Sequence, residues 1–157
     1  MDLRRPELLG IYLNDHLAGS VGGVETARRA RGSNQGNEFG APLARICAEI
    51  ESDRETLEAV MEELGVARSR IKPAIGWLGE KLGRLKPNGQ LRGYSPLSRV
   101  IELEGLLLGV TGKLRLWRLL DELVGNQART DFPALAARAE SQRATVEDLQ
   151  VKAARLL

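Results

Sequence analysis

The feature that most constrains this chain is a near-repetition of its own sequence at a distance of 89 residues. Moving the 157-residue chain against itself by that distance places the segment 51–58 over 140–147, and five of the eight positions are identical. The same shift, without a gap, lays Asp15 on Glu104, and each acid precedes its repeated segment by 36 residues. We therefore expect two halves, each built from the same pair of elements.

Those elements are expected to be helices. Only 4% of the residues are aromatic, and apolar residues recur every three or four positions between Gly and Pro breaks. This pattern predicts an all-α protein with one domain, 1–157, that folds as a four-helix bundle. The expected helices are about 5–30, 41–64, 95–124 and 131–157, with a shorter one, from about Ile71 to Leu85, in the connection 66–94. The helix pairs then span about 5–65 and 95–157.

Local signals place the ends of these helices. Gly65 stands where a helix commonly ends, because glycine adopts the left-handed conformation there at little cost. Ser95 followed by Pro96 is typical of a helix start, and Asp131 is expected to cap the last helix.

Charged residues recur at matched positions inside the apolar pattern. Glu104 lies among apolar neighbours one turn before and one turn after it, which indicates that it faces the core. Glu51 and Glu140 each have an arginine three residues later on the same helix face. We therefore expect a buried polar cluster inside the bundle. Its six members are Asp15, Glu51, Arg54, Glu104, Glu140 and Arg143.

This arrangement resembles the ferritin-like, di-iron carboxylate superfamily. In that family one acid on each of two helices, with a Glu-x-x-His on each of the other two, binds a pair of metal ions. Here Arg54 and Arg143 stand where both histidines would be. The long connection 66–94 is also similar to the family's crossover. The resemblance implies a ferritin-like bundle of two repeated helix pairs with a short extra helix in the crossover.

The two arginines change what such a site can do. An arginine stays protonated and offers no lone pair to a metal, so Arg54 and Arg143 are expected to bond the carboxylates in place of metal ions. We expect no catalytic residues, no cofactor and no metal. These expectations favour a non-enzymatic protein over an enzyme. The alternative is a carboxylate-only site for a divalent metal such as Mn or Fe, serving storage or oxidation. Its ligands would be Asp15, Glu51, Glu104 and Glu140.

Two further features suggest packing and partners. Seven glycines lie in the first and third helices, and we expect them to let these helices approach closely. They are Gly10, Gly19, Gly22, Gly23, Gly105, Gly109 and Gly112. Residues 67–92 carry seven basic residues against one acid, which leaves open an interaction module that binds an acidic partner. Aromatic residues for base stacking are scarce, so we expect no nucleic-acid partner.

The remaining composition narrows the cellular setting. Cys47 is the only cysteine, so an internal disulfide is impossible. The longest strongly apolar run is too short to span a bilayer, and the N-terminus lacks the apolar stretch of a signal peptide. His16 is the only histidine, which excludes most histidine-dependent catalysis. We expect a cytoplasmic protein that forms a homodimer through helix faces.

Overall fold

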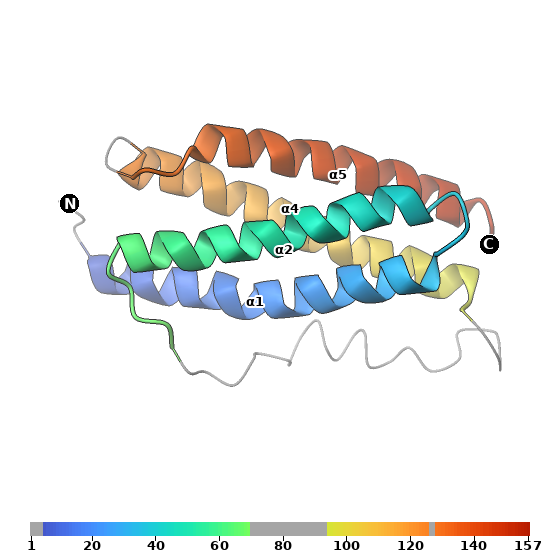
Figure 1. Ribbon diagram of the computed structural model, residues 1–157, viewed down its shortest axis with the longest axis horizontal. Coiled ribbons are helices and arrows are strands. Elements are labelled where there is room, and N and C mark those ends of the chain that lie inside the picture. Colours follow the sequence, from blue (N-terminus) through green and yellow to red (C-terminus); the bar gives the residue numbers. More distant parts are fainter. Residues whose placement is uncertain (1–4, 70–93, 126–127) are drawn as a thin grey trace.

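The computed structural model describes residues 5–69, 94–125 and 128–157. Within these ranges the chain folds into four α-helices and contains no strand. The helices are α1 (Pro6–Ser33), α2 (Gly40–Glu63), α4 (Pro96–Val124) and α5 (Phe132–Ala154), packed as a bundle (Figure 1). The all-α class and the four long helices are confirmed. The short helix expected from Ile71 to Leu85 lies outside the described residues.

Local capping explains where α4 and α5 begin and where α2 ends. The Ser95 side chain accepts a hydrogen bond from the backbone N–H of Ser98, and the Asp131 side chain accepts one from Ala134. At the end of α2, Gly65 has a φ of +68°, and its N–H and the next one bond back to the last turn. This is the Schellman pattern, which satisfies carbonyl groups that the helix itself leaves unpaired.

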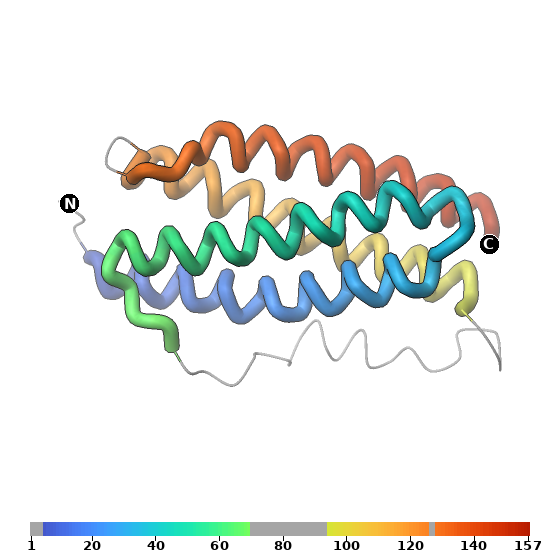
Figure 2. The backbone as a smooth tube through the Cα atoms, in the orientation of Figure 1, coloured from blue at the N-terminus to red at the C-terminus, as the bar shows by residue number. Residues whose placement is uncertain are grey.

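The directions of the helices are those of a bundle with one long connection. α1 and α2 form an antiparallel pair, and so do α4 and α5, while α2 and α4 run in the same direction (Figure 2). The chain therefore leaves α2 at one end of the bundle and enters α4 at the other. The most extensive helix contacts are those of α1 with α2, α1 with α4, α4 with α5 and α2 with α5.

The core consists of two apolar clusters, one toward each end of the bundle. The first, near the α1–α2 loop, includes Val24, Leu43, Ile50, Leu106, Val110 and Val146. The second, near the start of α1, includes Leu13, Leu57, Leu114, Trp117, Phe132 and Ala139. On α2, Asp53 separates the two clusters, and on α5 Gln142 does the same. Both side chains are buried, so a polar layer crosses the middle of the bundle.

The glycines do not serve the close helix packing that the sequence suggested. A Cβ atom added at Gly19, Gly23, Gly105, Gly109 or Gly112 would meet nothing within 4 Å. At Gly10 it would meet only a Val66 methyl group, at an ordinary 3.7 Å. The expectation of close approach between the first and third helices is therefore wrong at these positions, because five of these glycines face open space and Gly10 meets only Val66.

Candidate functional site

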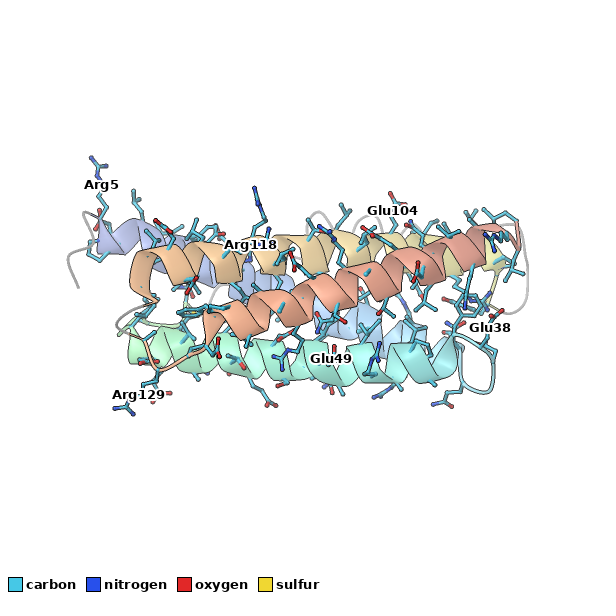
Figure 3. All side chains as sticks on the ribbon, turned by 90° about the horizontal axis from the view of Figure 1, so that it is seen from above. Arg5, Glu38, Glu49, Glu104, Arg118 and Arg129 are labelled. Atoms are coloured by element: carbon cyan, nitrogen blue, oxygen red, sulfur yellow. The ribbon has the colours of Figure 1, made fainter. Side chains whose placement is uncertain are left out.

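The structure does not gather the six expected cluster residues in the core. Asp15, Glu104 and Glu140 are exposed, and Glu51, Arg54 and Arg143 are only partly buried. Glu104 points outward from α4 (Figure 3). The expectation that these six side chains form one buried cluster is therefore wrong.

Four of the six instead form ion pairs at the surface. Glu51 pairs with Arg28 across α2 and α1, and Glu140 pairs with Arg118 across α5 and α4. Each arginine of the repeated segments pairs with the glutamate four residues later on its own helix. These pairs are Arg54 with Glu58 and Arg143 with Glu147. Exposed pairs of this kind contribute about 0.5 kcal/mol each.

The buried polar layer lies one helix face away, around Asp53. Its carboxylate is 2% exposed and forms ion pairs with Lys113 of α4 and Arg138 of α5, one on each oxygen. Gln142 of α5 joins the layer through three hydrogen bonds. Its Nε2 donates to Asp53 Oδ2 at 3.2 Å and to Glu49 Oε2 at 2.9 Å, and its Oε1 accepts from Lys113 Nζ at 2.5 Å.

Both acids of this layer have cationic partners within the protein. Lys113 and Arg138 pair with Asp53, and the partly exposed Glu49 lies 3.9 Å from Arg45 of its own helix. Burial lowers the pKa of Lys113, and the neighbouring Asp53 carboxylate opposes that shift. A buried carboxylate is costly unless it is paired and hydrogen-bonded, and both conditions hold for Asp53.

The repeat relates the members of the layer to each other. A shift of 89 residues carries Asp53 to Gln142 and Glu49 to Arg138. Each residue contacts the repeat partner of the other residue on its helix: Glu49 contacts Gln142, and Asp53 contacts Arg138. Positions matched by the repeat thus exchange places between α2 and α5, as the two sides of a two-fold contact do.

A second buried polar group lies at the end of the bundle where α4 begins. Glu102, 2% exposed, accepts from Arg29 at 2.7 Å and from the Tyr94 hydroxyl at 2.6 Å. Asn34 is buried beside it and accepts from Arg99 Nε at 2.6 Å. Burial and the Glu102 carboxylate raise the pKa of Tyr94. These contacts tie Tyr94, two residues before α4, to the end of α1.

The donor set of the polar layer does not fit a pair of metal ions. In the described part of the chain, no three His, Cys, Asp or Glu side chains come together in a way that could hold a metal. The two carboxylates of the layer already accept from protonated side chains or an amide. Ammonium and guanidinium groups offer no lone pair to a metal while they are protonated.

Comparisons with other proteins give no family assignment. No family model, no curated protein and no solved structure matches this chain. None of the described helices is long and apolar enough to cross a membrane.

Proposed function

We propose that this protein is a non-enzymatic bundle of ferritin-like architecture whose internal metal site has been replaced by a salt-bridge network. The observation that carries the proposal is the pairing of the buried Asp53 carboxylate with two internal cations. Lys113 and Arg138 supply the positive charge that a metal pair would otherwise bring to carboxylates at mid-bundle. In this proposal the interior stabilises the fold, and the residues that carry the function lie on the surface.

The helix arrangement supports the ferritin-like part of the proposal. Two antiparallel pairs joined by one long connection, with α2 and α4 running in the same direction, match the connectivity that this architecture requires. The crossed contacts of Glu49 with Gln142 and Asp53 with Arg138 support an origin by duplication of one helix pair. None of the six residues expected from the sequence belongs to this network.

Metal analysis of the full-length protein tests the proposal. The protein would be incubated anaerobically with ferrous iron or manganese, desalted, and analysed by mass spectrometry for bound metal. We expect far less than one metal ion per chain and an unchanged midpoint of unfolding. Near-stoichiometric metal, with an unfolding midpoint raised by the same metal, would overturn the proposal.

A pair of variants makes this test specific to the layer. Changing Lys113 and Arg138 together to alanine removes both internal cations and leaves Glu49 and Asp53 without them. We expect this variant to retain more Mn²⁺ than the wild type, because carboxylate oxygens suit that ion. The matched control changes Arg54 and Arg143 to alanine, removes the same charge at the surface, and should leave metal retention unchanged.

A further inference from the structure

Helix α4 is apolar on two sides, and only one of them faces the core. Leu103, Leu106 and Leu114 are buried, but Leu97, Leu108 and Leu119 are 39%, 48% and 40% exposed. The exposed leucines are 11 residues apart, which is close to three full turns of an α-helix. They therefore form a straight apolar line along the outer face of α4, and we call this line the leucine stripe.

Three charges lie along one edge of the leucine stripe. Glu104 and Arg115 are both exposed and are 11 residues apart, and exposed Glu122 lies 18 residues, or about five turns, beyond Glu104. In Figure 3, Glu104 points away from the bundle. Within two to three turns of Leu108, this edge thus carries a negative charge on one side and a positive charge on the other, and Glu122 lies farther out, beyond Leu119.

This pattern is complementary to itself. Leu97 and Leu119 are equally far from Leu108, so a second α4 packed antiparallel about Leu108 would place each of them opposite the other. A two-fold axis through Leu108 keeps matching edges together. Glu104 would then lie opposite Gly112 of the second copy, three residues or about 4.5 Å along the helix from its Arg115.

We propose that two copies of this chain pair through the leucine stripe, α4 against antiparallel α4, with Leu108 on the two-fold axis. Packing would remove six exposed leucine side chains from water, three from each copy. Each Glu104 would pair with an Arg115 across the interface. The open space beside Gly105 and Gly112 would let the second helix approach without a clash. This inference does not depend on the proposed loss of a metal site.

Sedimentation equilibrium tests the interface on the full-length protein. We expect a concentration-dependent dimer for the wild type, and Leu108→Glu should raise the dissociation constant about 100-fold or more, because two like charges would meet on the axis. Ala59→Glu is the control, because Ala59 is exposed on α2, which is not one of the helices that pack closely against α4. Circular dichroism should show the same helix content for all three proteins, since both substituted side chains are already exposed.

A charge exchange tests the orientation of the two copies. Glu104→Arg and Arg115→Glu should each weaken the dimer about tenfold, and the double variant should restore it. A wild-type protein that stays monomeric over the whole concentration range would overturn the proposal. So would a dimer that is unaffected by Leu108→Glu, or single charge variants that weaken it without rescue by the double variant.

Discussion

Replacing Asp53 by asparagine is the most direct perturbation of the buried polar layer, because it keeps the shape of the side chain and removes its charge. The change leaves Lys113 and Arg138 without their shared anion. Removing one partner of a buried ion pair costs about 3–5 kcal/mol. Lys113 and Arg138 remain 15% and 33% exposed, so solvent offsets part of this loss, and we expect about 2–3 kcal/mol.

Urea unfolding followed by circular dichroism and by the fluorescence of buried Trp117 measures this change. Glu140→Gln is the control, because Glu140 belongs to the repeated segment but pairs with Arg118 at the surface. That variant should stay within about 0.5 kcal/mol of the wild type. In thermal unfolding, the Asp53→Asn variant should melt about 5–10 °C below the wild type.

A double-mutant cycle then shows whether Asp53 and Lys113 interact directly. Lys113→Met removes the cation and keeps an unbranched side chain, while Arg138 still pairs with Asp53. The double variant should be destabilised by less than the sum of the two single variants, by about 1 kcal/mol or more. Additive effects, or an Asp53→Asn variant as stable as Glu140→Gln, would refute the assignment of the layer as the polar centre of the fold.

Four further predictions concern other parts of the molecule. Burial lowers the pKa of Lys113, so the unfolded chain binds that proton more tightly than the folded one. The free energy of unfolding of the wild type, relative to that of Lys113→Met, should therefore rise as the pH increases toward 10.5. Urea midpoints of the two proteins, measured against pH, test this. Glu102→Gln should cost about 1–3 kcal/mol in urea unfolding, because this buried carboxylate accepts from Arg29 and Tyr94. Cys47 is buried and its thiol pKa is raised by burial, so a thiol reagent should modify it slowly in buffer and rapidly in urea. Gly65→Ala should destabilise the protein by about 1 kcal/mol in thermal unfolding, because φ at this position is +68°.

The helices could be predicted from the sequence because the forces that define their ends are local. Gly65, Ser95 and Asp131 act on backbone groups within a few residues of themselves, and the structure places helix ends beside each of them. The spacing of apolar residues supplied the rest, since it depends only on the helical repeat.

The polar layer could not be located from identical residues alone. Glu51 and Arg54 are identical to their repeat partners, but they are only partly buried. Asp53 is buried, and its repeat partner is Gln142. Two positions along a helix correspond to about 200° of rotation, enough to move a side chain from surface to core. The available signal was the spacing of Ile50, Asp53 and Leu57, which places the carboxylate within an apolar row.

The misplacement of Glu104 has a different physical cause. Its apolar neighbours indicated burial, but α4 has apolar residues on two sides, and Leu108 one turn away is itself exposed. Apolar neighbours reveal the core only when a helix has a single apolar face. The second apolar side of α4 made the prediction for Glu104 wrong, and this second side is also the leucine stripe of the proposed interface.

The polar layer also explains how two separate apolar clusters maintain one alignment of α2 against α5. These two helices pack less closely than α1 with α2, α1 with α4 or α4 with α5, so apolar contacts hold their register only weakly. Glu49 and Asp53 are four residues apart, and so are Arg138 and Gln142. An antiparallel slip of one turn would separate Asp53 from Arg138 and leave a carboxylate with 2% exposure short of a counter-charge. Slipped arrangements are therefore penalised by desolvation, which gives the buried charges a role in specifying the fold.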